Sequence, residues 1–176
     1  SDIDGEAEYD YSGRSVAISA DGSFVAIVAH HNDGNGDSSG HVRIYQNVDN
    51  IWTQIGSDID GEAEDDQSGY SVALSDDGSV VAIGAKNNDA NGSNSGHVRI
   101  YQNVGGTWTQ IGSDIDGEAE YDYSGLSVSL SDDGSVVAIG AHHNDGNGDS
   151  SGHVRIYQKS SSISIGENKT AVANYT

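Results

Sequence analysis

The chain repeats one motif three times. The segment that begins at Ser1 returns at Ser57 and again at Ser113, so the repeat period is 57 − 1 = 56 and 113 − 57 = 56 residues. A fixed period of this size is typical of repeat proteins, in which each unit is one supersecondary element that buries its apolar face against its neighbours. The fold and the function therefore have to be sought in what the copies share.

Each copy predicts four β-strands. In the first copy, residues 15–19 alternate apolar and polar side chains, and residues 24–29 form a nearly continuous apolar run. Asp21-Gly22 lies between them and predicts a hairpin turn, because glycine adopts the positive φ that such a turn needs. A third strand is expected at 41–46 and a fourth at 51–55.

The sequence therefore predicts an all-β fold of tandem four-stranded antiparallel meanders, arranged as β-propeller-type blades. We expect blades at 1–56, 57–112 and 113–166, the last with a divergent final strand, and a tail at 167–176. Closed propellers have about four to eight blades, so three blades cannot close a ring within one chain. We expect a homo-oligomer or further blades of the same protein to cover the ends, with the tail as an assembly strand or the start of a next module.

The composition is strongly acidic. With 7 Lys and Arg against 28 Asp and Glu, the formal net charge is −21, which disfavours nucleic acid as a partner. The sequence has no run of about 20 apolar residues, so membrane insertion is not expected. Cations are the natural counterparts of this charge, and solubility in a salty medium is an alternative reason for it.

Two segments of the second copy carry a family resemblance. Residues 69–85 and 96–101 resemble the FG-GAP repeat of integrin-α-like β-propellers, and residues 108–112 resemble the blade ending of a variant in large secreted or surface proteins of marine microbes. The resemblance implies propeller blades, an extracellular or cell-surface location, and a binding or adhesive role. The family's calcium loop between the first two strands is reduced here to residues 76–78, while the tail at 167–176 resembles the start of a cadherin-like module.

One candidate calcium site lies in the long loop after the second strand. Its alternating residues Asp33, Asn35 and Asp37 offer oxygen ligands of the kind that calcium prefers. The alternative is a glycine-rich turn with solvated acids. The corresponding candidate ligands in the other copies are Asp89, Asn91, Asp145, Asn147 and Asp149.

A second candidate lies in the acidic run at the start of each copy. If residues 2–10 are extended, their acids lie on one side of the chain and need a counterion. A cation such as calcium or the recurring arginines Arg43, Arg99 and Arg155 could supply it. For these arginines, structural ion pairing with Asp of the same or a neighbouring blade is favoured over substrate binding. The candidate ligands are Asp4, Glu6, Asp60, Glu62, Asp116 and Glu118.

Histidines and aromatic residues favour structural roles. Adjacent residues of a strand point to opposite sides, so His30 and His31 are poorly placed to share one zinc or copper ion. His97 and its matched residues open a strand after Ser-Gly and are expected to make a structural hydrogen bond. Trp108 and Tyr101 fit packing between blades better than a sugar-stacking platform. No enzyme is expected, because an active site is normally asymmetric and these acids recur in every copy.

Together these features predict an extracellular, non-enzymatic repeat module for adhesion or self-assembly, supported by calcium. The alternative is a calcium-dependent, lectin-like propeller whose acidic rim binds a glycan. A glycan or a surface protein is therefore a further candidate partner.

Overall fold

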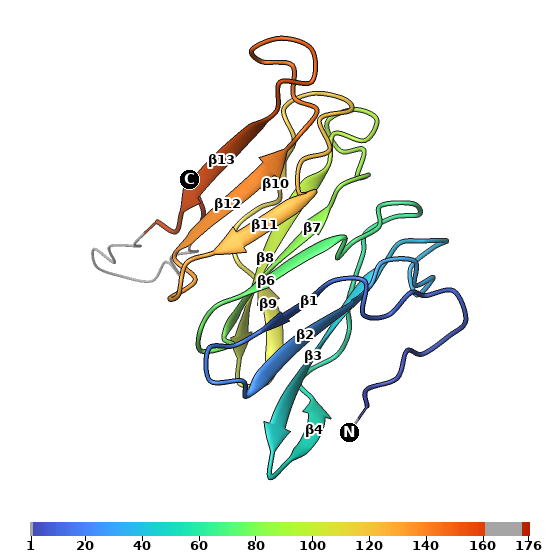
Figure 1. The fold of residues 1–176 in the computed structure, drawn as a ribbon, viewed down its shortest axis with the longest axis vertical. Helices are drawn as coiled ribbons and strands as arrows, with labels where there is room; N and C mark the ends of the chain where they lie inside the picture. The colour runs from blue at the N-terminus through green and yellow to red at the C-terminus, as the bar shows by residue number, and fades with distance from the viewer. Residues whose placement is uncertain (1, 161–173) are drawn as a thin grey trace, which may run out of the picture.

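The computed structural model describes residues 2–160 and 174–176, and the regular elements in this part of the chain are all strands. They form three antiparallel sheets, one for each repeat copy, as Figure 1 shows. Blade 1 contains β1 (Val16–Ile18), β2 (Phe24–Ala29), β3 (His41–Val48), β4 (Ile51–Gln54) and β5 (Ile59–Asp60). Blade 2 contains β6 (Ser71–Leu74), β7 (Val80–Ala85), β8 (His97–Val104), β9 (Thr107–Gln110) and β10 (Ile115–Asp116). Blade 3 contains β11 (Ser127–Leu130), β12 (Val136–Ala141) and β13 (His153–Gln158).

The strands of blade 1 follow the predicted meander order β1-β2-β3-β4. The expected fourth strand at 51–55 forms as β4, which pairs with one half of β3, and an additional strand that was not expected, β5, pairs with His41 and Val42 in the other half. Gly56 has a φ of 72° between the two strands, a conformation that favours glycine. Blade 2 repeats this arrangement, with β9 and β10 both paired to β8.

The Asp-Gly turn between the first two strands of each blade forms as predicted. In blade 1, Gly22 has a φ of 71°, and the Asp21 carboxylate accepts hydrogen bonds from the backbone N of Ser23 at 2.9 Å and from the Ser19 hydroxyl at 2.8 Å. Asp77 and Asp133 make the matched bonds in blades 2 and 3. The serines on each side of the turn therefore fix its geometry.

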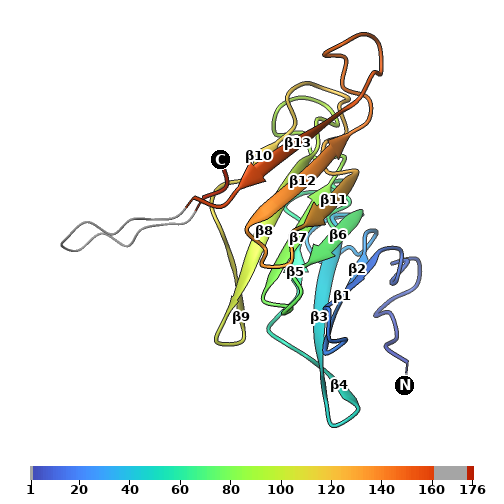
Figure 2. The ribbon, with the colours of Figure 1, turned by 60° about the vertical axis from the view of Figure 1, so that its left-hand side comes forward.

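The blades stack in chain order, with blade 2 between the other two (Figures 1 and 2). Two apolar clusters hold the stack together because each combines side chains from two consecutive blades. Between blades 1 and 2, the buried residues include Val42, Ile44 and Ile83, and Trp108 and Tyr101 pack against them. Between blades 2 and 3, Ile100 and Ile139 are among the buried residues. The expected role of the aromatic residues in packing between blades is thus observed.

Backbone hydrogen bonds also connect the blades at their first hairpin turns. The backbone N of Ala20 donates to the carbonyl oxygen of Asp76 at 2.9 Å, and the backbone N of Asp76 donates to that of Asp132 at 2.8 Å. The same kind of bond therefore links each blade to the next. A side chain also links blades 1 and 2, because the Trp108 indole Nε1 donates to the carbonyl oxygen of Ile55 at 3.0 Å.

The two outer faces of the stack are apolar and exposed. Val16 and Ile18 on blade 1 have exposed fractions of 60% and 63%. Val154 and Ile156 on blade 3 have exposed fractions of 65% and 70%. As predicted, the three blades do not close a ring.

Residues 174–176 complete the edge of blade 3. Gln158 and Thr176 exchange two backbone hydrogen bonds of 3.0 Å, so this end of the chain pairs with the edge of its own β13. The Tyr175 side chain is buried in the cluster between blades 2 and 3, and its hydroxyl donates to the carbonyl oxygen of Gly134. This part of the expected assembly strand therefore lies on its own sheet. The divergent final strand expected at 162–166 and residues 167–173 of the tail lie outside the described residues.

Candidate functional site

The long loops at one end of the blades contact the acidic runs that connect the copies. In blade 2, Gly117 N donates to the carbonyl oxygen of Gly96 at 2.7 Å, and Ser124 N donates to that of Ser95 at 2.9 Å. The connecting run after each complete blade is therefore fixed against the long loop of that blade.

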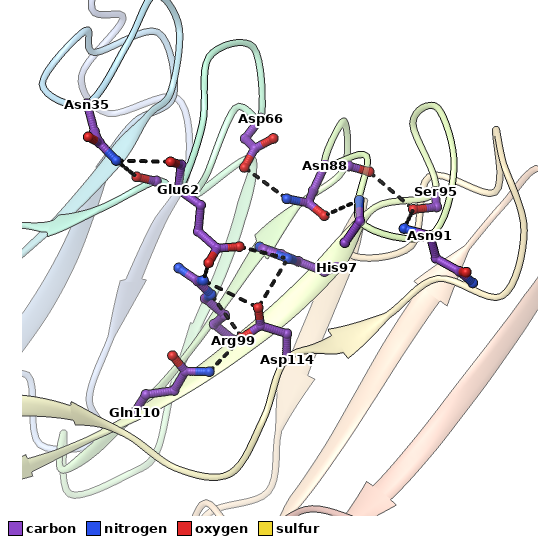
Figure 3. A network of polar contacts seen from close by, with 12 residues as sticks. Asn35, Glu62, Asp66, Asn88, Asn91, Ser95, His97, Arg99, Gln110 and Asp114 are labelled. Atoms are coloured by element: carbon purple, nitrogen blue, oxygen red, sulfur yellow. Dashed lines mark hydrogen bonds and ion pairs between the residues drawn. The ribbon is translucent and has the colours of Figure 1, made fainter.

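A buried asparagine anchors each loop. The Asn88 side chain donates from Nδ2 to Asp66 Oδ2 at 2.9 Å and accepts at Oδ1 from the backbone N of Ala90 at 3.0 Å (Figure 3). Burial raises the pKa of the Asp66 carboxyl, while the hydrogen bond from Asn88 opposes that rise. The matched pairs are Asn32 with Asp10 and Asn144 with Asp122.

The loop candidates for calcium make local hydrogen bonds. Asp33 Oδ1 accepts from the backbone N of Ser38 at 2.8 Å, which closes the turn. The Asn35 amide donates to the carbonyl oxygens of Gly61 at 2.8 Å and Glu62 at 3.0 Å, so it holds the next connecting run. Asp37 is exposed and accepts from the Ser38 hydroxyl at 3.3 Å.

The same contacts recur in the other blades. Asp89 and Asp145 each accept from a backbone N five residues further on, at 2.6 Å. The Asn91 amide binds the carbonyl oxygens of Gly117 and Glu118. Asn147 and Asp149 are exposed. Calcium at these loops stays a prediction.

The acidic runs use both their backbone and their side chains. Asp60 and Asp116 lie in β5 and β10, where they pair with His41 and His97 in the sheet. The backbone oxygen of Asp4 accepts from Arg43 at 3.0 Å. The carboxylates of Glu6, Glu62 and Glu118 each lie against the arginine of one blade, namely Arg43, Arg99 and Arg155 respectively. Structural ion pairing of the arginines is therefore observed, but the partner common to all three is a glutamate, and only Arg99 also pairs with an aspartate, Asp114.

Two groups of side chains bring a histidine together with two carboxylates, and we call them the histidine clusters. The cluster of blade 1 consists of Glu6, His41 and Asp58, and the cluster of blade 2 consists of Glu62, His97 and Asp114. In each cluster, one ligand atom from each residue lies within 4.8 Å of the other two. Among the Asp, Glu and His side chains of the described residues, these are the groups of three that meet this distance.

In the blade 1 cluster, His41 Nδ1 lies 3.8 Å from Glu6 Oε2 and 3.7 Å from Asp58 Oδ2. The other oxygens of the two carboxylates have separate partners. Arg43 Nη1 lies 3.2 Å from Glu6 Oε1, and Gln54 Nε2 donates to Asp58 Oδ1 at 2.6 Å. Both carboxylates therefore direct their second oxygen toward the histidine.

The blade 2 cluster has the same arrangement (Figure 3). His97 Nδ1 lies 3.7 Å from Glu62 Oε2 and 3.9 Å from Asp114 Oδ2. Arg99 pairs with Glu62 Oε1, and its Nε and Nη2 donate to Asp114 Oδ1 at 3.0 Å and Oδ2 at 3.3 Å. Gln110 Nε2 donates to Asp114 Oδ1 at 2.6 Å.

The blade 3 site is incomplete in the described residues. His153 Nδ1 lies 3.6 Å from Glu118 Oε2, and Arg155 Nε lies 3.7 Å from Glu118 Oε1. The side chain of His153 is 26% exposed, against 2% for His41 and 3% for His97.

The environment of His97 favours its neutral form. Burial lowers its pKa, and the negative charges of Asp114, Asp66 and Asp116 oppose that shift without cancelling it. Its Nδ1 atom is buried and has no hydrogen-bond partner among the described residues. The structural hydrogen bond expected for this histidine is therefore not found at Nδ1, because the carboxylate oxygens stop beyond hydrogen-bond distance.

The sequence analysis identified Glu6 and Glu62 as candidate ligands but missed the histidines and Asp58 and Asp114. A signal for the histidines was present. Residues i and i+2 of a strand point to one face, so His97 and Arg99 share the face that meets the acidic runs. No sequence signal showed that the runs before and after one blade both reach that face.

The adjacent histidines lie at the rim. His30 and His31 have ring centroids 4.3 Å apart, and the His30 ring lies 5.9 Å from that of Tyr70. Burial lowers the pKa of His30 to about 4, with further lowering by the charges of His31, Arg14 and Lys86. No group of three metal-ligating residues in the described part of the chain includes these histidines.

Stacked antiparallel meanders that leave a ring open define the class of protein as a β-propeller repeat protein. A family model described as the FG-GAP repeat matches residues 57–101 and 113–157, just over half of the chain. The chain belongs to the FG-GAP repeat family, as the resemblance in the sequence indicated. A comparison with curated proteins gives no match. The described residues contain no helix that is both long and apolar enough to cross a membrane.

Two solved structures share the fold. One is a protein assigned as a 6-phosphogluconolactonase from Bacteroides uniformis, with 14% identity and a TM-score of 0.54, in which 82% of this chain covers 35% of that chain. The other is the periplasmic gluconolactonase of Pseudomonas aeruginosa, with 16% identity and a TM-score of 0.52, in which 82% of this chain covers 38% of that chain. The chain thus spans just over a third of each protein's length, and at these identities the likeness shows the fold alone.

Proposed function

We propose that the chain is an extracellular, non-enzymatic repeat module that assembles head to tail, with blade 3 of one copy packed against blade 1 of a second copy. The extracellular location rests on the family, because FG-GAP repeats are typical of secreted and surface proteins. Self-assembly rests on the two outer faces of the stack.

The exposure of matched residues supports the assembly. Val98 and Ile100 of blade 2 have exposed fractions of 0% and 2%, because blade 3 covers them. Their counterparts Val154 and Ile156 on blade 3 have exposed fractions of 65% and 70%. An apolar sheet face of this kind is stabilised by burial. Within one chain a face of this kind is covered by the next blade twice, once between blades 1 and 2 and once between blades 2 and 3.

The complementary surface lies on blade 1. Val72 of blade 2 is 8% exposed and packs in the cluster that blade 1 shares with blade 2. Its counterpart Val16 on blade 1 is 60% exposed. A second copy that repeats the internal contact would bury Val16 against Val154 and Ile156 of its neighbour. Two copies joined at both faces would contain six blades, within the range of about four to eight in closed propellers.

Calcium is proposed to support this assembly. Each chain carries a net charge of −21, and chains of like charge repel each other unless counterions reduce the charge. The acidic rim formed by the loops and connecting runs offers carboxylate and backbone oxygens, which calcium prefers.

Light scattering coupled to size-exclusion chromatography tests the assembly. At physiological salt with calcium, we expect a mass that is a multiple of the chain mass of 18.3 kDa, and Ile156→Asp should shift it to the monomer mass. Val104→Asp is the matched control, because Val104 is 62% exposed but lies on the middle blade. A monodisperse wild-type monomer would reject the assembly. An assembly that a chelator leaves unchanged would reject the calcium support alone.

The absence of catalysis is tested separately. Because the structural neighbours are named as lactonases, sugar-lactone hydrolysis is the activity to assay, and we expect no turnover above the buffer rate. Turnover that disappears in Glu62→Gln would show that the chain is an enzyme.

A further inference from the structure

We propose that the two histidine clusters bind a divalent transition metal of the zinc type, one ion in blade 1 and one in blade 2. This inference is independent of the proposed assembly, because both clusters lie within one chain. Each site would use one imidazole nitrogen and one oxygen from each of two carboxylates.

The spacing of the ligand atoms suits such an ion. In the blade 2 cluster, His97 Nδ1 lies 3.7 Å and 3.9 Å from the two carboxylate oxygens, and all three atoms lie within 4.8 Å of one another. Atoms with these spacings have a common centre about 2.2 to 2.5 Å from each, near the zinc–nitrogen and zinc–oxygen distances of about 2.0 to 2.2 Å. Small side-chain shifts would therefore complete the coordination, and solvent could supply a fourth ligand.

The histidines provide the second line of support. The His97 Nδ1 atom is buried, is directed at the two carboxylates, and has no hydrogen-bond partner among the described residues. A buried polar atom without a partner destabilises a fold. In blade 1, the His41 side chain is 2% exposed and its Nδ1 has the same relation to Glu6 and Asp58. A metal ion would give His97 Nδ1 a partner, whereas in His41 the buried nitrogen without a partner among the described residues is Nε2, so the support in blade 1 rests on the spacing of Nδ1 and the two carboxylates.

In blade 1 the other contacts of the carboxylates leave the inner oxygens to the metal, whereas in blade 2 the Arg99 Nη2 atom also donates to Asp114 Oδ2 at 3.3 Å, a bond that the metal would replace. In blade 1, Arg43 contacts Glu6 Oε1 and Gln54 donates to Asp58 Oδ1, so Oε2 and Oδ2 are the atoms that face the histidine. Contacts of this kind orient metal ligands in known sites. The two carboxylates and one guanidinium have a net charge of −1, which a divalent ion would reverse to +1.

The ligand set distinguishes zinc from calcium. Imidazole nitrogen suits zinc and other late transition metals, whereas calcium takes about six to eight oxygen ligands. The histidine clusters are thus chemically different from the oxygen-rich loops at the rim. We expect calcium to compete weakly for them.

The bound ion would stabilise one blade internally. In blade 2, Glu62 belongs to the run before the blade, Asp114 to the run after it, and His97 to β8. A metal that binds all three would fix both connecting runs to the third strand. Because it would bind the folded chain and not the unfolded one, it would raise the melting temperature.

Blade 3 provides an internal control. It retains His153 and Glu118 in the same relation, but no second carboxylate of the described residues joins them in a group of three. A site that needs both carboxylates therefore predicts two zinc ions per chain, and a site that needs only the histidine and the glutamate predicts three.

Calorimetric titration of the chelator-treated full chain with zinc, together with metal analysis after dialysis, tests this inference. We expect two ions in the wild type, one in Asp58→Asn, one in Asp114→Asn and two in His153→Gln. His143→Gln, at the rim, should also retain two. Circular dichroism of each variant without metal checks that it folds.

Several results would overturn the inference: no zinc bound by the wild type, two ions still bound by the Asp58→Asn and Asp114→Asn double variant, or a site lost in His143→Gln. If the asparagine variants do not fold, cobalt(II) bound to the wild type replaces them as the readout. Visible spectra that show no histidine nitrogen ligand would then reject the sites.

Discussion

The Asn88 side chain donates a hydrogen bond of 2.9 Å to the Asp66 carboxylate, and both residues are buried. The bond joins a connecting run to the long loop of the blade that follows it. Blades 1 and 3 have the same bond between Asn32 and Asp10 and between Asn144 and Asp122. This pair is therefore a repeated structural element of the rim.

Replacing Asn88 with alanine should destabilise the protein by about 1 to 3 kcal/mol, because the buried Asp66 carboxylate loses its donor. Urea denaturation measures this loss. Asn87→Ala is the control, since Asn87 is less buried and its side chain accepts a hydrogen bond from Lys86 Nζ instead. An equal loss in both variants would contradict the structural role of the pair.

Gly117 allows the connecting run to approach the loop of blade 2. A methyl group at Gly117 would overlap the carbonyl oxygen of Ser95, whereas one at the matched residue Gly5 would meet the Ser12 Cβ at 3.0 Å. Gly117→Ala should therefore cost about 1 to 3 kcal/mol and Gly5→Ala clearly less. Thermal melts of the two variants provide the comparison. A larger loss in Gly5→Ala would show that the loop contact does not limit this position.

The arginine ion pairs should differ in strength from blade to blade. The side chain of Arg43 is 7% exposed and that of Arg155 is 31% exposed, and each faces a glutamate. Removing one partner of a buried pair is costly, whereas an exposed pair contributes about 0 to 1 kcal/mol. Arg43→Gln should therefore destabilise the chain more than Arg155→Gln in equilibrium unfolding, and the reverse order would contradict this.

Acid should destabilise the protein through His30. Its pKa in the folded chain is about 4, below the usual value of 6.5, so the unfolded chain binds the proton more tightly. This contribution is complete above pH 6.5 and is lost as the pH falls toward 4. His30→Gln should reduce the loss of stability in this window, and His142→Gln should reduce it less because His142 is exposed. Denaturation midpoints between pH 4 and 7 decide the matter, and an unchanged slope in His30→Gln would reject it.

Much of the fold follows from local patterns in the sequence. Alternation and apolar runs predicted the first three strands of each blade, and the Asp21-Gly22 turn forms as expected. The additional strand β5 was not predicted. The glycine at position 56, which has a positive φ, was the available signal for a turn after β4. That the chain pairs with β3 again at Ile59 depends on where β3 lies, which is a tertiary contact.

The sequence by itself determined the repeat, the strand order, the turn chemistry, the acidic rim and the family, because each depends on residues close together in one copy or on the 56-residue period. The tertiary structure decided which side chains meet. Glu62, His97 and Asp114 come from three separated segments, and they form a cluster because both connecting runs pack against the face of β8 that carries the histidine. The stacking of the blades likewise decides that Ile100 is buried and Ile156 exposed, although both occupy the same position in the repeat.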